Sequence, residues 1–175
     1  MVFLDFFYAL REAGLNPASP PRTIRELDAA AERLTVRSGG RIERAGFLQN
    51  MPAWWPYFWP IMFGGHLYDA EHDRAVFTDA ATIAAYEWVR SYPQKLGVEV
   101  SREFGNSYNR SFHSPQDPFI SGRVAMIVQG PWLANFIRHY GAGLDYGAVP
   151  VPVAESMYDP ARPAGMLEAD VLIIP

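Results

Sequence analysis

The chain has 175 residues, of which 49% are apolar, and carries 15 Lys and Arg against 19 Asp and Glu. This composition fits a folded domain and excludes a disordered tail, and the net charge of −4 excludes a generally basic nucleic-acid-binding surface. The absence of cysteine from the sequence excludes thiol nucleophiles, Cys-ligated metals and disulfides.

The first part of the chain predicts two helices and one strand. An apolar run predicts a helix over residues 2–13, followed by a glycine of the kind common after a helix C-terminus. Thr23 and Glu26 have the spacing of a capping box, and the helix that they open has an apolar face and ends near residues 38–40. Residues 44–49 then predict a short strand that leads into an aromatic segment.

The middle of the chain predicts one long helix between two polar segments. Residues 69–74 predict a polar loop, and a helix follows from residue 78 or 79 to about Tyr92. Pro93 is expected to end that helix, because proline interrupts helical hydrogen bonding. Residues 97–116 contain several Asn and Ser residues and predict an open, polar loop.

The last part of the chain alternates helices and strands. A short helix is expected over 118–120, and the continuous apolar run 124–128 predicts a buried strand. Gly130-Pro131-Trp132 is expected to start the next helix, with proline in its first turn. Residues 146–153 and 171–175 predict extended segments. The alternation along the whole chain predicts an α/β layered architecture.

The aromatic segment is the most unusual feature of the sequence. Six of the ten positions 54–63 are aromatic, namely Trp54, Trp55, Tyr57, Phe58, Trp59 and Phe63. Neighbouring rings point in different directions and two prolines shorten any helix, so not all six can enter one core. Aromatic faces stack on sugar rings, and Gln49 and Asn50, just before the segment, can bond sugar hydroxyls. Core packing is the alternative for each ring.

Trp132 is the second candidate for ligand contact. It follows a predicted buried strand and starts a helix, so it is expected at the carboxyl end of that strand. Ligands of α/β sheets bind at this edge, and the free N–H groups of a helix start attract acceptor oxygens. The alternative is a ring that closes the end of the core.

Other polar clusters are weaker candidates for a functional site. His66, Asp69, His72 and Asp73 lack the spacing of a metal site and are interpreted as a solvated loop. Glu168 and a second carboxylate two residues later share one side of a strand, and a solvated pair is favoured over an acid/base pair. The sequence has no glycine-rich phosphate loop, and neither a metal nor a cofactor is expected.

Several sequence blocks, taken in order, resemble the extracellular solute-binding proteins of carbohydrate ABC transporters, the group that contains maltodextrin- and glycerol-phosphate-binding proteins. The blocks are residues 9–15 with 20–27, Trp59-Pro60 with Gly64-Gly65 and 67–69, residues 119–126 running into Gly130-Pro131-Trp132, and Tyr146-Gly147 with 149–152.

The resemblance implies an α/β, type II periplasmic-binding-protein-like fold, whose two lobes close like a hinge over a ligand. Residues 1–175 would form a single partial domain, mainly the carboxy-terminal lobe, with 169–175 starting the strand that crosses back to the amino-terminal lobe. The family is periplasmic or extracellular, free or lipid-anchored. Its export signal is not found in this chain.

The family also implies roles for particular residues. Trp132 corresponds to the tryptophan that stacks on the sugar, and Trp54, Trp55 and Tyr57 correspond to a segment that faces the cleft. Glu168 stands where the family has a glycine pair, and it joins Gln49 and Asn50 as a candidate ligand contact.

The expected function is therefore reversible binding of a carbohydrate or polyol phosphate, without catalysis, by a protein that is a monomer at full length. Its partners would be membrane permease subunits, and no nucleic acid is expected. Two alternatives stay open. One is a carbohydrate-active enzyme that uses Glu168 with another carboxylate, and the other is a fragment without activity of its own.

Overall fold

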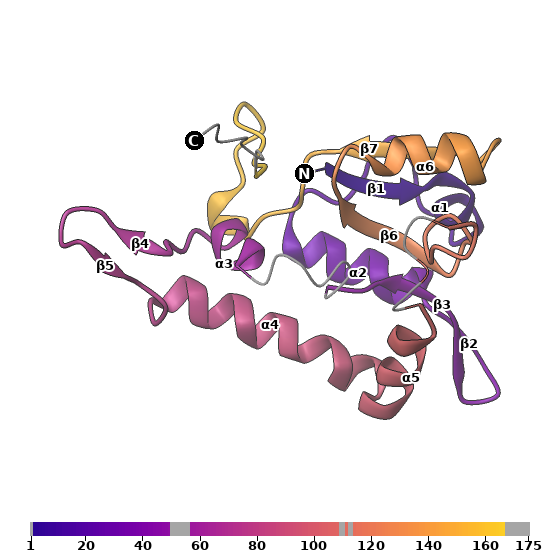
Figure 1. The fold of residues 1–175 in the computed structure, drawn as a ribbon, viewed down its shortest axis with the longest axis horizontal. Helices are drawn as coiled ribbons and strands as arrows, with labels where there is room; N and C mark the ends of the chain where they lie inside the picture. The colour runs from indigo at the N-terminus through magenta and orange to yellow at the C-terminus, as the bar shows by residue number, and fades with distance from the viewer. Residues whose placement is uncertain (1, 50–56, 109–110, 112–113, 167–175) are drawn as a thin grey trace, which may run out of the picture.

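A computed structural model of the chain describes residues 2–49, 57–108, 111 and 114–166. Figure 1 shows a sheet with helices on both sides and a long helical arm beyond it. The described elements, in chain order, are β1 (Val2–Phe6), α1 (Phe7–Glu12), α2 (Ile24–Leu34), β2 (Val36–Ser38), β3 (Arg41–Phe47), α3 (Phe58–Met62), β4 (Tyr68–Asp69), β5 (Arg74–Ala75), α4 (Ala80–Leu96), α5 (Val98–Tyr108), β6 (Val124–Gln129), α6 (Leu133–Tyr140), β7 (Tyr146–Val149) and the 3-10 turn η1 (Glu155–Met157).

The main sheet has the strand order β2-β3-β6-β1-β7. β3 and β6 are parallel, whereas β1 is antiparallel to both of its neighbours, β6 and β7. β3, β6 and β7 therefore all end at the edge where β1 begins, and Figure 1 shows these ends on the side of the sheet that faces α3. We call this side the carboxyl edge.

Helices cover both faces of the sheet. On one face, α2 packs on β3 and β6, with α4 beyond it, and these elements share the larger hydrophobic core. On the other face, α6 packs its buried Leu133 and Ile137 with Phe119 and Ile127 in a smaller core. The predicted α/β layers are therefore present.

The helix predicted over residues 2–13 is wrong in its first half. Val2–Phe6 form strand β1, and only Phe7–Glu12 are helical. A short apolar run has no periodicity that separates a buried strand from a helix, and here strands pair with it on both sides. Gly14 follows the helix as predicted, with a φ of +67° that suits glycine.

The start of α2 confirms the predicted capping, with one difference. The Thr23 hydroxyl accepts a hydrogen bond from the Glu26 N–H at 3.3 Å. The Glu26 carboxylate reaches back to the Arg22 N–H at 2.8 Å, one residue earlier than a capping box requires. The predicted end of this helix near residues 38–40 is wrong, because α2 ends at Leu34 and β2 follows it. The glycines at 39 and 40 have φ of +54° and +78° and form the turn of a β2–β3 hairpin.

Pro93 does not end α4, contrary to the prediction. The helix continues to Leu96 and stops at Gly97, which has a φ of +89°. Because proline has no N–H, Pro93 cannot donate to the carbonyl of Val89, four residues earlier in the helix. The side chain of Gln49 donates to that carbonyl instead.

The open loop predicted over 97–116 is also wrong in its first half, because Val98–Tyr108 form α5. Val100 and Phe104 are four residues apart and pack on the larger core, so the helix has one apolar face among its polar residues. The polar loop predicted over 69–74 is present as the turn 70–73, and the two-residue strands β4 and β5 on either side of it make a small hairpin that was not predicted.

The last third of the chain follows its prediction more closely. All six residues of β6 are buried, as the continuous apolar run indicates. The helix predicted at 118–120 is a hydrogen-bonded turn. α6 begins at Leu133 with Trp132 as its N-cap, slightly later than predicted, and ends before Gly141. None of the helices among the described residues is long and apolar enough to cross a lipid bilayer.

Candidate functional site

The carboxyl edge brings together segments that are far apart in the sequence. Phe47 in β3 pairs with Met126 in β6, so the residues that follow the two strands leave the sheet at similar levels. Gln49 comes two residues after β3, and Gly130 comes directly after β6. Two of the predicted ligand residues, Gln49 and Trp132, therefore lie at the same edge of the sheet.

Trp132 occupies the turn between β6 and α6 and is 37% exposed. Its ring lies over the backbone of Gly130, where a Cβ atom would come within 2.2 Å of the ring carbon Cη2 and 2.4 Å of Cζ2 and Cζ3. Only glycine at position 130 leaves room for this ring orientation. The structure thus places a partly exposed aromatic face where α/β proteins bind ligands.

Gln129 supports this turn from inside the protein. Its side chain is 1% exposed, and its Oε1 accepts a hydrogen bond from the N–H of Gly130 at 2.9 Å. The bond helps to fix the backbone that carries Trp132. Gln129 is not among the residues predicted from the sequence, although a polar residue at the end of a continuous apolar strand is a visible signal.

Gln49 is buried in the same way, with 9% of its surface exposed. Its side-chain Nε2 donates to the main-chain carbonyl of Val89 at 3.1 Å. The main-chain carbonyl of Gln49 accepts from the indole N–H of Trp59 at 2.9 Å. The Oε1 atom is buried without a hydrogen-bond partner among the described residues. The predicted ligand contact by Gln49 stays a prediction, and its described contacts are with α3 and α4.

The aromatic segment is partly core. Phe58 and Trp59 are 2% and 5% exposed, and the Trp59 ring packs 5.9 Å from Phe47 and 4.6 Å from Trp88, measured between ring centroids. Core packing is therefore the correct interpretation for these two rings. Tyr57 is half-buried at the N-cap of α3, and its ligand contact stays a prediction.

The other predicted ligand residues are Asn50, Trp54, Trp55 and Glu168. All four lie outside the described residues, as does the predicted crossing strand 169–175.

The scaffold behind the edge depends on one carboxylate. Asp28 in α2 accepts hydrogen bonds from three groups of α4: the Trp88 indole at 2.9 Å, the Tyr92 hydroxyl at 2.8 Å and the Lys95 ammonium at 2.9 Å. Burial, reinforced by the charge of Asp28, raises the pKa of Tyr92 above its ordinary value, so the phenol stays protonated and keeps donating.

The polar segment after residue 65 does not gather into a metal site. Asp69 accepts hydrogen bonds from the ring Nδ1 of His72 at 2.9 Å and from Arg74 Nε at 3.2 Å, which stabilise the β4–β5 hairpin. Within the described part of the chain, no group of three or more His, Asp or Glu side chains is placed to hold a metal ion.

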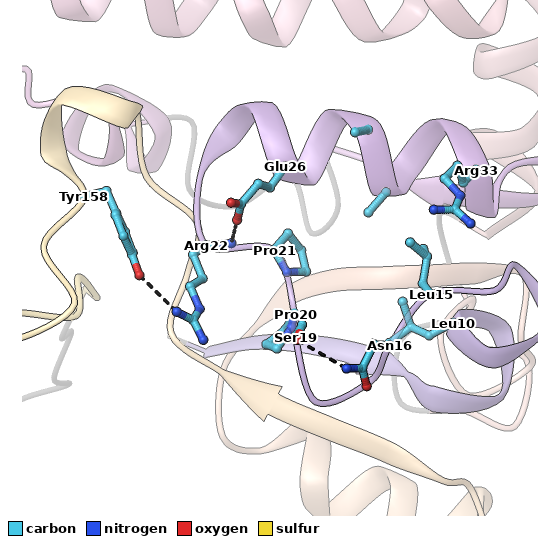
Figure 2. Close-up of a pocket in the computed structure, with 12 residues that line it drawn as sticks. Leu10, Leu15, Asn16, Ser19, Pro20, Pro21, Arg22, Glu26, Arg33 and Tyr158 are labelled. Carbon is cyan, nitrogen blue, oxygen red and sulfur yellow. Dashed lines mark hydrogen bonds between the residues drawn. The ribbon is translucent and has the colours of Figure 1, made fainter.

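Three of the cavities lined by described residues have volumes of about 590, 500 and 630 Å³, and none of these three includes Gln49, Tyr57 or Trp132 in its wall. Figure 2 shows the first, between the connector 15–22 and α2, where the Tyr158 hydroxyl accepts from Arg22 Nη1 at 3.2 Å. These cavities are separate from the aromatic face at the carboxyl edge.

A family model described as bacterial extracellular solute-binding protein matches residues 5–174. Among solved structures, the chain is similar to CpMnBP1 with mannobiose bound, with 30% sequence identity and a TM-score of 0.75 over 87% of this chain and 39% of that chain. It is also similar to UgpB from Mycobacterium tuberculosis in complex with glycerophosphocholine, with 25% identity and a TM-score of 0.60 over 88% of this chain and 36% of that chain.

A third similar structure shares the fold at lower identity. It is an ABC transporter solute-binding protein from Thermotoga lettingae bound with alpha-D-tagatose, with 22% identity and a TM-score of 0.67 over 93% of this chain and 40% of that chain. The chain thus spans about two fifths of the length of these solved proteins.

Proposed function

We propose that this chain, which belongs to the bacterial extracellular solute-binding protein family, provides part of the carbohydrate-binding cleft of the substrate-binding component of an ABC-type sugar importer. Its fold is part of the type II periplasmic-binding fold implied by the sequence resemblance. The family consists of binding proteins, so we expect reversible binding of a sugar or polyol phosphate without a chemical step.

One observation supports the proposal more than any other. A partly exposed tryptophan, Trp132, follows the buried strand β6 at the carboxyl edge, inside a sequence that matches the family over nearly its whole length. An indole face in this position can stack on the C–H face of a sugar ring, while polar groups nearby bond the hydroxyls. CpMnBP1 binds mannobiose, which supports a sugar as the first ligand to try.

The remaining parts of the proposal concern the whole protein. We propose that residues 1–175 correspond mainly to the carboxy-terminal lobe, that a second lobe completes the cleft, and that Trp54, Trp55, Asn50 and Glu168 face it. The closed form would bind membrane permease subunits, since ligand contacts from both lobes favour closure. The extracellular assignment of the family supports a periplasmic or extracellular location.

The test is calorimetric titration of the purified full-length protein, because a second lobe is proposed to complete the cleft. The ligands are mannobiose, maltotriose and glycerophosphocholine, and wild type is compared with Trp132→Ala. Removing a stacked indole should cost about 1–3 kcal/mol, which raises the Kd about 5-fold to 150-fold. Tyr140→Ala is the matched control, because Tyr140 ends the same helix and is 38% exposed. Equal affinity in wild type and Trp132→Ala would refute the stacking role, and production of free mannose from mannobiose or glucose from maltotriose would favour an enzyme instead.

A further inference from the structure

The long helix α4 keeps its course through Pro93, although proline has no N–H to donate to the carbonyl four residues earlier. That carbonyl belongs to Val89, and it accepts a hydrogen bond from Nε2 of Gln49 at 3.1 Å. Gln49 lies 40 residues away in the sequence, just after β3. A side-chain amide from the carboxyl edge therefore replaces the backbone donor that Pro93 lacks.

The orientation of the Gln49 amide follows from this bond. The side chain is buried, and its Oε1 has no hydrogen-bond partner among the described residues. Turning the amide over would bring two acceptor oxygens together at the Val89 carbonyl and leave that carbonyl unpaired. Each unpaired buried acceptor is unfavourable. With respect to the described residues, the observed orientation leaves one such acceptor, Oε1, whereas the turned amide leaves both Oε1 and the Val89 carbonyl without a donor, so the Val89 carbonyl decides which way the amide points.

The backbone of Gln49 makes a second connection, to α3. Its carbonyl accepts from the indole N–H of Trp59 at 2.9 Å, and the Trp59 ring packs 4.6 Å from the ring of Trp88, the residue before Val89. α3 also carries Tyr57 at its N-cap. Gln49 thus contacts α4 through its side chain and α3 through its main chain, and so joins three elements at the carboxyl edge.

We propose that Gln49 is a positioning residue of the binding site and not a ligand contact. It anchors the end of β3 to the carbonyl that Pro93 leaves free in α4, and thereby fixes α3 and Tyr57 at the carboxyl edge. The part of this inference that concerns ligand affinity rests on the proposed sugar-binding function, whereas the anchor itself does not.

The test is a double-mutant cycle with Gln49→Met, Pro93→Ala and the double variant. Methionine keeps the shape of glutamine but has no donor, whereas the alanine introduced by Pro93→Ala supplies an N–H that can reach the Val89 carbonyl within the helix. Gln49→Met alone should lower the folded-to-unfolded equilibrium constant about 5-fold to 30-fold. In the Pro93→Ala background, Gln49→Met should lower this equilibrium constant much less. Gln94→Met, at an exposed position of α4, is the control and should be neutral in both backgrounds.

Two further measurements separate positioning from ligand contact. The indole proton of Trp59, assigned in the NMR spectrum with a Trp59→Phe variant, should exchange faster in Gln49→Met and return to the wild-type rate in the double variant. The Kd for mannobiose, measured by calorimetry, should rise by no more than the anchor contributes, about 30-fold at most, and should recover in the double variant. Full-length wild-type protein that binds no sugar contradicts the proposed function, and the unfolding and exchange measurements still decide the anchor.

Three results would overturn the inference. The first is an equal loss of stability on Gln49→Met in wild type and in Pro93→Ala, which means that the Val89 carbonyl does not need the glutamine. The second is a loss of affinity that Pro93→Ala does not restore, which indicates direct ligand contact. The third is that neither Gln49→Met nor the double variant folds. If Gln49→Met alone does not fold, the inference requires that Pro93→Ala restores folding in the double variant.

Discussion

The backbone of α2 comes close to the sheet at Gly46 in β3. A Cβ atom at this position would lie 2.0 Å from the carbonyl oxygen of Ala31 and 2.7 Å from its carbonyl carbon and Cα. These are backbone atoms, which cannot turn aside as the end of a side chain can. Thr35 bridges the contact, since its hydroxyl accepts from the Gly46 N–H at 3.0 Å and donates to the Ala31 carbonyl at 2.7 Å. Gly46→Ala must therefore separate the helix from the strand.

The expected cost of Gly46→Ala has two parts. Overpacking at a rigid contact costs about 1–3 kcal/mol, and loss of the two hydrogen bonds through Thr35 costs about 1 kcal/mol each. The sum of about 3–5 kcal/mol should lower the Tm by about 6–20 °C at 2–4 °C per kcal/mol for a protein of this size. Thermal unfolding followed by circular dichroism measures this shift.

Gly105→Ala is the matched control for that experiment. Gly105 lies inside α5, and a Cβ there would meet no atom within 4 Å. Alanine is a better helix former than glycine by about 0.5–1 kcal/mol, so this variant should be slightly more stable than wild type. A Gly46→Ala protein that melts within about 2 °C of wild type, or two variants with shifts of the same sign, would refute the argument from close approach.

Two further predictions concern Asp28 and its partners on α4. Asp28→Asn should lower the free energy of unfolding by about 1–3 kcal/mol, because an amide nitrogen would face the Lys95 ammonium. Urea titration measures this change. The control is Glu32→Gln on the exposed side of α2, which should change the free energy of unfolding by less than about 0.5 kcal/mol. The raised pKa of Tyr92 means that the unfolded state releases its proton first, so stability should fall as the pH rises above about 10. Tyr92→Phe should flatten this fall in a series of Tm measurements, and an unchanged slope would contradict the assignment to Tyr92.

The parts of the fold that sequence analysis predicted correctly have local causes. The cap at Thr23 depends on residues within one helical turn, and the apolar run of β6 is long enough that only a buried element can hold it. The incorrect predictions depend on distant partners. β1 is a strand because β6 and β7 pair with it. Where α4 continues through Pro93, the donor to the free Val89 carbonyl comes from Gln49, 40 residues away. No local pattern in either segment contains that information.

The same distinction explains why the aromatic residues have different roles. Trp59 and Trp88 pack between β3, α3 and α4, where each ring meets other rings and each indole N–H finds an acceptor, so both are part of the scaffold. Trp132 follows β6 in a turn whose glycine lets the ring lie close against the backbone, with more than a third of the residue's surface exposed. Composition alone cannot separate these cases. The position of each ring relative to the ends of β3 and β6 does. Among these three tryptophans, it makes Trp132 the one whose removal should change affinity without removing a support of the core.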